Sequence, residues 1–229
     1  MKASLVQQEL KKLENKQQAK VLQGFFKTGK GQYGEGDIFL GIKVPDSRKI
    51  AKKFKDLPFN EIDILLHSKI HEGRMVAILL LVHNFENGKK EEIYKYYLKN
   101  TTKINNWDLV DLSAPKIVGN YLLNKDKDIL YKLAKSQNLW EKRIAIVSTW
   151  TFIRERQFKD TLKISEILLN DKHDLIHKSI GWMLREVGKK DQKVLEEFLN
   201  KHIKQMPRTT LRYAIERFEE NKRKSYLKK

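Results

Sequence analysis

The sequence of 229 residues contains no cysteine and few of the residues that interrupt helices. Without cysteine, the chain cannot form disulfide bonds, thiolate metal sites, iron–sulfur clusters or a cysteine nucleophile. Only four prolines and eleven glycines occur, and apolar residues recur at helical spacing while strand-like alternation is nearly absent. With 40% apolar and 33% charged residues, the composition is typical of a folded, soluble protein. We therefore predict an all-α protein that forms one domain over residues 1–229.

Signals of other protein classes are also missing. No uncharged apolar run has the length of a membrane-spanning helix, and residues 1–12 carry charges throughout instead of the apolar core of a signal peptide. We therefore expect a cytoplasmic protein. Gly29, Gly31 and Gly34 match the dinucleotide-binding pattern, but a helix predicted over residues 5–25 precedes them where a strand is required. Residues 27–37 are interpreted as a connecting loop, and no organic cofactor is expected.

The charge of the chain is strongly unbalanced. Lys and Arg number 47 against 29 acidic residues, which gives a formal net charge of +18. Such an excess opposes folding through self-repulsion, and a common use for it is binding to a polyanion. The charge favours a nucleic acid as the partner, although a generally basic soluble protein would show the same excess.

A weak internal repeat runs along the chain. Four segments each begin with a cation and continue with small and apolar residues: 74–79, 143–148, 178–183 and 212–217. Their starts lie 69, 35 and 34 residues apart, so one further repeat is expected near residue 108. This period is typical of stacked helix pairs. We predict a curved α-solenoid of HEAT-like repeats with a basic concave groove.

The segment from residue 176 to 190 has two stripes at helical spacing. One stripe is apolar and contains Ile176, Ile180, Met183, Leu184 and Val187, and the other contains Lys178, Trp182, Arg185 and Lys189. Residues 180 and 182 lie about 200° apart on a helical wheel, so Trp182 points away from the apolar stripe. A Trp between cations suits contact with a DNA sugar or base beside its phosphates. The alternative is a Trp packed against the adjacent repeat.

A second site is expected in the helix that starts near Trp107. Asn105 or Asn106 can cap this helix, and Asp108 complements the helix dipole in the first turn, which is a structural role. Trp107 and Asp111 are four residues apart and share a face. Asp111 is the stronger functional candidate, although a salt bridge to a neighbouring cation would also explain it. Pro115 should kink or restart this helix.

A third segment, from Leu139 to Arg143, turns into another repeat helix. An arginine at this helix start can hold a phosphate with its forked guanidinium group, but an ion pair between repeats would also explain Arg143. Two histidine pairs, residues 67 and 71 and residues 173 and 177, have the spacing of zinc ligands. Neither pair has an evident third ligand, so no metal is expected.

Together these segments resemble the AlkD-type DNA alkylation repair glycosylases, a family of HEAT-like-repeat proteins. The resemblance covers residues 20–218 and is carried by short motifs in order: 39–42 with Pro45, Trp107-Asp108-x-x-Asp111, Asn138-Leu139-Trp140-x-x-Arg143 and 181–186. It implies a monofunctional glycosylase that removes cationic alkylated purines, such as 3-methyladenine and 7-methylguanine, from DNA. We expect it to act as a monomer on double-stranded DNA, without a cofactor. By matching position, Asp111 would be the catalytic carboxylate. Trp107 and Trp182 would flank the sugar and backbone of the lesion, and Arg143 would hold DNA.

Elementary chemistry agrees with this implied activity. A cationic purine is a good leaving group, so one carboxylate that stabilises the sugar cation and places a water is enough. The chain departs from some relatives at Asn106, Asp174 and Leu175, where they carry aromatic residues. Two alternatives stay open: a non-catalytic DNA-binding module that recognises damaged or branched DNA, and a protein-binding scaffold.

Overall fold

The computed structural model describes residues 1–228, and its regular structure is helical throughout. These residues contain no strand; one isolated bridge joins Ile38 and Ile70. The all-α prediction is therefore confirmed. By its internal contacts the chain divides into two compact units, residues 1–113 (unit 1) and 114–229 (unit 2), and the expected single domain stays a prediction. No helix within residues 1–228 is both long and apolar enough to span a bilayer.

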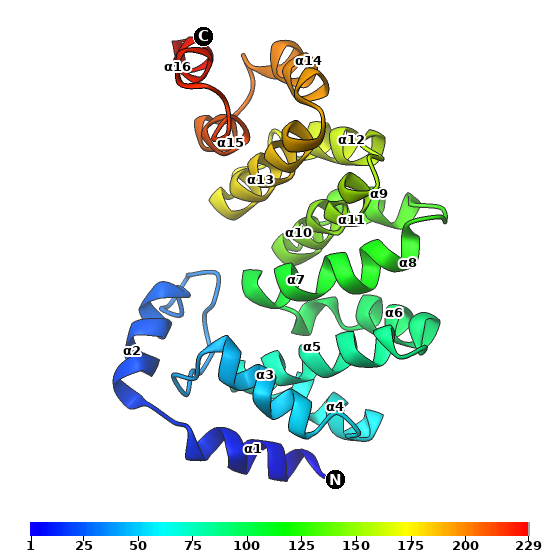
Figure 1. Cartoon of the computed structure of the whole chain (residues 1–229). Helices are drawn as coiled ribbons and strands as arrows, with labels where there is room; N and C mark the ends of the chain where they lie inside the picture. The colour runs from blue at the N-terminus through cyan, green and yellow to red at the C-terminus, as the bar shows by residue number, and fades with distance from the viewer. Residues whose placement is uncertain (229) are drawn as a thin grey trace. The chain divides into compact units, whose positions relative to one another are not determined.

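Unit 1 is built around one buried helix, α5. Its elements are α1 (Ala3–Lys12), α2 (Lys16–Phe25), α3 (Val44–Lys53), α4 (Phe59–Leu66), α5 (His71–Glu86), α6 (Lys90–Lys99), the 3-10 turn η1 (Thr101–Lys103) and the start of α7 (Trp107–Ala114). Helix α5 packs against α1, α3, α4 and α6, and Figure 1 shows it among these helices. Because neighbours cover it on several sides, its apolar residues from Met75 to Val82 are almost all buried.

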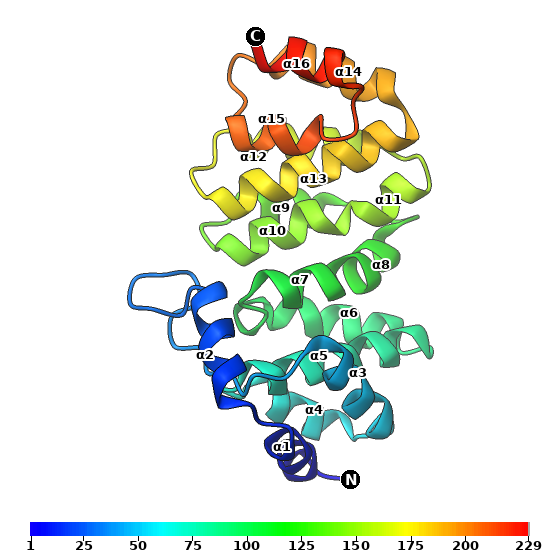
Figure 2. The same ribbon diagram turned by 60° about the vertical axis from the view of Figure 1, so that its left-hand side comes forward.

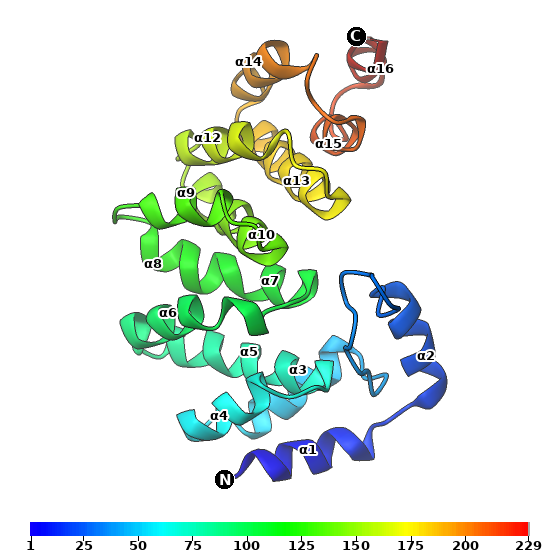
Figure 3. The ribbon, with the colours of Figure 1, turned by 180° about the vertical axis from the view of Figure 1, so that it is seen from behind.

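Unit 2 contains two layers of helices. Its elements are the π-helical segment η2 (Pro115–Gly119), α8 (Asn120–Leu122), α9 (Asp128–Ala134), α10 (Leu139–Ser148), α11 (Trp150–Arg154), α12 (Lys159–Leu168), α13 (Asp174–Lys190), α14 (Gln192–His202), α15 (Arg208–Ala214) and α16 (Glu220–Lys228). Within this unit α10, α13 and α15 lie on one side, and α9, α12 and α14 lie on the other (Figures 1 and 3). Helix α13 packs against both layers.

The repeat that was expected from the sequence is present in the helices. Helices α5, α7, α10, α13 and α15 begin at residues 71, 107, 139, 174 and 208, so the missing repeat near residue 108 is α7. Figure 2 shows α10, α13 and α15 following one another within unit 2. The curvature and the basic concave groove stay predictions.

Local sequence explains how the repeats are joined. The Asn138 Oδ1 accepts a hydrogen bond from the Trp140 backbone N–H at 2.8 Å and so caps α10. Gly181 lets α13 approach α15, because a Cβ at this position would collide with Thr210 and Tyr213. At Pro115 the α7 helix gives way to π-helical hydrogen bonding, which agrees with the predicted interruption.

Candidate functional site

The starts of α5 and α7 are joined by a network of four buried charged residues in unit 1. The Asp108 carboxylate accepts a hydrogen bond from His71 Nε2 at 2.9 Å, and His71 Nδ1 lies 3.4 Å from Asp37. Arg74 forms an ion pair with Asp37 at 2.6 Å. All four residues are buried. Two cations therefore balance two carboxylates, which is how charges are accommodated away from water.

This network controls the protonation of His71. Burial by itself lowers the pKa of His71, but the Asp108 charge and the hydrogen bonds to Asp108 and Asp37 raise it, and the resulting pKa is about 8. Burial likewise acts against the charge of Asp37, yet His71 and Arg74 hold the pKa of this carboxyl below its usual value. His71 and Asp37 are therefore both charged at neutral pH, and the network links α7 to α5.

Trp107 lies at the start of α7 against an aromatic cluster. Its ring stacks on Phe26, with ring centres 5.1 Å apart and planes at 14°, and it meets Phe25 edge to face at 5.9 Å. The Asn106 side chain accepts a hydrogen bond from the Trp107 backbone N–H at 2.8 Å. Trp107 is therefore held in one orientation and is half-buried.

Asp111 lies one helical turn after Trp107 and is half-buried. Nearby, the buried Tyr97 hydroxyl shares a hydrogen bond of 2.8 Å with Ser113 Oγ. Burial raises the pKa of the Tyr97 hydroxyl, and the charge of Asp111 raises it further. Asp111 therefore lies close enough to the neutral Tyr97 hydroxyl to act on it through space, at a position fixed by the anchored start of α7.

The two predicted stripes of α13 differ in burial in unit 2. The apolar stripe is fully buried: Ile176, Ile180, Met183, Leu184 and Val187 are each 0% exposed. Trp182 is half-buried, and its indole has no hydrogen-bond or ring partner among the described residues. The prediction that Trp182 lies off the apolar stripe is confirmed.

The cations of the second stripe have acidic neighbours that were not anticipated. Lys178 pairs with Asp174 at 2.7 Å, Lys189 with Glu186 at 2.9 Å, and Arg185 with Glu186 at 3.4 Å and with Glu216. These local pairs reduce the positive field of the stripe. The Lys178 and Lys189 side chains are exposed, so their ion pairs are weak and exchange with other partners, whereas the largely buried Arg185 is held between Glu186 and Glu216.

Arg143 is buried, with only 5% of its surface exposed. Its guanidinium group donates a hydrogen bond of 2.7 Å to the backbone carbonyl of Leu175. This contact joins α10 to the second residue of α13, so Arg143 links two repeats, close to the alternative considered from the sequence. Its DNA-holding role stays a prediction.

Sequence reasoning missed the function of His71 within the fold. His67 and His71 have the spacing of zinc ligands, but each has a different partner. His67 Nδ1 bonds the backbone carbonyl of Asp63 at 2.9 Å, whereas His71 joins the buried network. Residues 1–228 contain no group of three or more potential metal ligands of the His, Cys, Asp or Glu type. One signal was available: His71, Glu72 and Arg74 directly precede the apolar run 75–82, and such residues need partners when they are buried.

The chain is similar to known proteins over nearly its whole length. The model of the family described as DNA alkylation repair enzyme matches residues 6–218. Three solved chains also match. One, described as a predicted DNA alkylation repair enzyme from Enterococcus faecalis, is 20% identical with a TM-score of 0.73, over 90% of this chain and 97% of that one. At this identity the likeness shows the fold alone. No curated protein matches the sequence.

Proposed function

Because the chain belongs to the DNA alkylation repair enzyme family, we propose that it is a DNA glycosylase that excises positively charged alkylated purines. The proposed substrates are 3-methyladenine and 7-methylguanine in double-stranded DNA. Asp111 is the proposed catalytic carboxylate, and the observation that carries this role is its position on α7, one turn from Trp107 and beyond the anchoring contact of Asp108 with His71. Asp108 is bound to His71 within the buried network, so it is assigned a structural role.

The departing purine does not need to be protonated by the enzyme. An alkylated purine is already cationic, so it departs with the electrons of the N-glycosidic bond and becomes neutral. The sugar is left as an oxocarbenium-like cation, which a nearby carboxylate stabilises. Asp111 also orients a water, whose oxygen bonds to the sugar carbon and whose proton passes to the carboxylate. The faces of Trp107 and Trp182 add cation–π stabilisation.

The second stripe of α13 is proposed to bind the DNA backbone. Lys178 and Lys189 keep their charged groups at the surface in contact with acidic neighbours, and Arg185, which is half-buried between Glu186 and Glu216, is proposed to contact the backbone beside them. Phosphates compete for such weakly held cations and release counterions, so binding is expected to fall steeply with salt. Arg143 is also proposed to help bind the DNA backbone, from its position at the junction of α10 and α13.

The proposal is tested with double-stranded DNA that carries 7-methylguanine. We expect the wild-type protein to release the base and leave abasic sites. Asp111→Asn keeps the shape of the side chain but removes its charge, and we expect single-turnover excision to fall by about 100-fold or more, because a preorganised charge of this kind contributes on the order of 3 kcal/mol. DNA binding should persist or improve, since one repulsion of phosphate is gone.

Asp56→Asn is the matched control. Asp56 is an exposed carboxylate that belongs to neither the network nor the stripe, so this variant makes the same charge change elsewhere in unit 1. It should excise at the wild-type rate. If Asp111→Asn also does so, the assignment of the carboxylate is wrong. If no variant excises a cationic lesion while all bind DNA with strong salt dependence, the protein is a non-catalytic DNA-binding module.

A further inference from the structure

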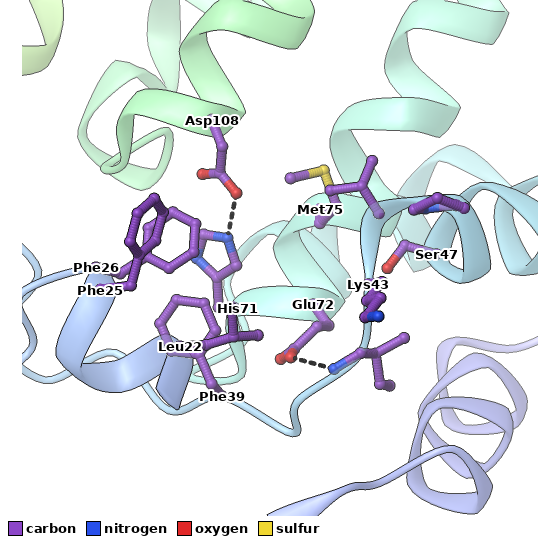
Figure 4. Close-up of a pocket in the computed structure, with 13 residues that line it drawn as sticks. Leu22, Phe25, Phe26, Phe39, Lys43, Ser47, His71, Glu72, Met75 and Asp108 are labelled. Atoms are coloured by element: carbon purple, nitrogen blue, oxygen red, sulfur yellow. Dashed lines mark hydrogen bonds and ion pairs between the residues drawn. The ribbon is translucent and has the colours of Figure 1, made fainter. Parts of the chain in front are cut away.

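Unit 1 contains an apolar cavity that the proposed glycosylase chemistry does not use. Its volume is about 340 Å³, which lies in the range of sites for small molecules. Its walls come from α2, the extended segment 39–43, and the starts of α3 and α5 (Figure 4). Phe25, Phe26 and Phe39 contribute aromatic side chains, and Phe39 is itself stacked on both Phe26 and His71, with ring centres 4.9 and 4.4 Å apart.

The buried charged groups in the cavity wall already have partners. Glu72 is buried and accepts hydrogen bonds of 2.9 to 3.1 Å from the backbone N–H groups of Leu40, Gly41 and Ile42. Asp108 is bound to His71. The remaining charged side chain, Lys43, is exposed to solvent. A charged ligand that entered the apolar part of the cavity would therefore lose its hydration without a buried unpaired counterion. This arrangement favours an uncharged ligand.

One polar group in the wall has no partner. Ser47 lines the cavity from α3 and is 1% exposed, and its hydroxyl forms no hydrogen bond with any described residue. Buried hydroxyl groups are nearly always hydrogen-bonded, so an unpaired one indicates a missing partner. Ser47 can donate or accept. A ligand that places one polar group against Ser47 would satisfy it.

We propose that this cavity binds a small uncharged aromatic molecule, of one or two rings, that carries a single hydroxyl or N–H group directed at Ser47. The aromatic walls contact the faces of the ring system, and the Ser47 hydroxyl supplies the one specific hydrogen bond. Neither Asp111 nor Trp182 lines this site, although the site shares His71 and Asp108 with the buried network.

The test uses two probes of the same shape. 2-Naphthol carries a hydroxyl where 2-methylnaphthalene carries a methyl group, and both are titrated by fluorescence at neutral pH. We expect saturable binding of both to the wild-type protein, with 2-naphthol binding more tightly. Ser47→Ala should weaken 2-naphthol about 5- to 10-fold, as expected for one lost hydrogen bond, while 2-methylnaphthalene binds equally well or better.

Ser165→Ala is the matched control, because the Ser165 hydroxyl is also buried without a hydrogen-bond partner but lies on α12 in unit 2. It should leave both titrations unchanged. Met75→Trp, which fills the cavity, should abolish binding of both probes. If that variant does not fold, Leu22→Trp serves instead, since Leu22 lines the cavity and is only half-buried.

Two results would overturn the proposal. The first is the absence of saturable binding of either probe to the wild-type protein. The second is an equal response of both probes to Ser47→Ala, or no response to the cavity-filling variant, because the ligand would then bind elsewhere. Excision of 7-methylguanine is measured on the same samples, and its failure would refute the proposed function without affecting the outcome for the cavity.

Discussion

The two candidate regions use charge in opposite ways. At the starts of α5 and α7 in unit 1, Asp37, His71, Arg74 and Asp108 are buried, and each has a partner across the network. On α13 in unit 2, the cations lie half-buried or exposed beside acidic residues that are mostly one helical turn away. The first arrangement fixes the backbone of α7, whereas the second leaves charges available at the surface.

The difference follows from solvation. Breaking a buried pair leaves a charge without water or counterion, so each member of the unit 1 network depends strongly on the others. Surface pairs interact through water and salt, and losing one partner changes little. We infer that the unit 1 network supports the position of the candidate catalytic residues, while the α13 stripe supports reversible binding to a polyanion.

The sharpest test of this comparison removes one carboxylate from each region. Asp108→Ala leaves His71 without its main hydrogen-bond acceptor, and we expect the free energy of unfolding to fall by about 3–5 kcal/mol. Asp174→Ala removes the exposed partner of Lys178 and should cost less than about 1 kcal/mol. The free energy of unfolding of both variants is measured by urea denaturation. Equal losses would show that the two regions do not differ.

The histidines offer a test by pH. Since the pKa of His71 is raised to about 8, its contribution to stability is fully present below about pH 6.5 and is lost as the pH rises through 8, which amounts to about 2 kcal/mol. The difference in unfolding free energy between wild-type and His71→Asn should therefore shrink between pH 6 and pH 9.

In unit 2 the sign is reversed. Burial lowers the pKa of His173, so folding disfavours its protonated form, and the effect of His173→Asn should change below about pH 6.5 and stay constant above it. Stability curves for both variants across this range measure the two effects. A pH-independent difference for His71→Asn would show that this histidine is not charged in the folded protein.

The two tryptophans should separate stability from excision. Trp107 is stacked on Phe26, so Trp107→Ala should lower the free energy of unfolding by about 2 kcal/mol and also slow excision. Trp182 has no ring partner among the described residues, so Trp182→Ala should slow excision by the equivalent of about 1–2 kcal/mol with a smaller loss of stability. Thermal melting and single-turnover excision are compared. Trp182→Phe, which keeps an aromatic face, should recover part of the rate.

The smallest effect is expected from a single lysine of the stripe. Lys178→Ala should change stability by less than about 0.5 kcal/mol, but it should reduce the slope of log affinity against log salt by about one. Lys95→Ala is the control, because Lys95 forms a comparable exposed pair with Glu91 at 2.6 Å on α6. DNA titrations at several salt concentrations distinguish the two. An unchanged slope for Lys178→Ala would remove this residue from the proposed DNA contacts.

Residue pattern alone determined much of this protein. Apolar spacing and the scarcity of proline and glycine indicate an all-α chain, and the interval of about 34 residues located the repeat helices, including α7. The separation of Trp182 from the apolar stripe of α13 also followed from helical geometry. These features are local, since they depend on residues a few positions apart on one helix.

The tertiary structure decided what the pattern could not. Asp37, His71, Arg74 and Asp108 are distant in sequence, and only packing brings them together. Partners of this kind have no sequence period, so the sequence showed neither the buried network around His71 nor the contact of Arg143 with the Leu175 carbonyl. A helical pattern reports which face of a helix is apolar, but the partner of a buried charge depends on which other helix lies against it.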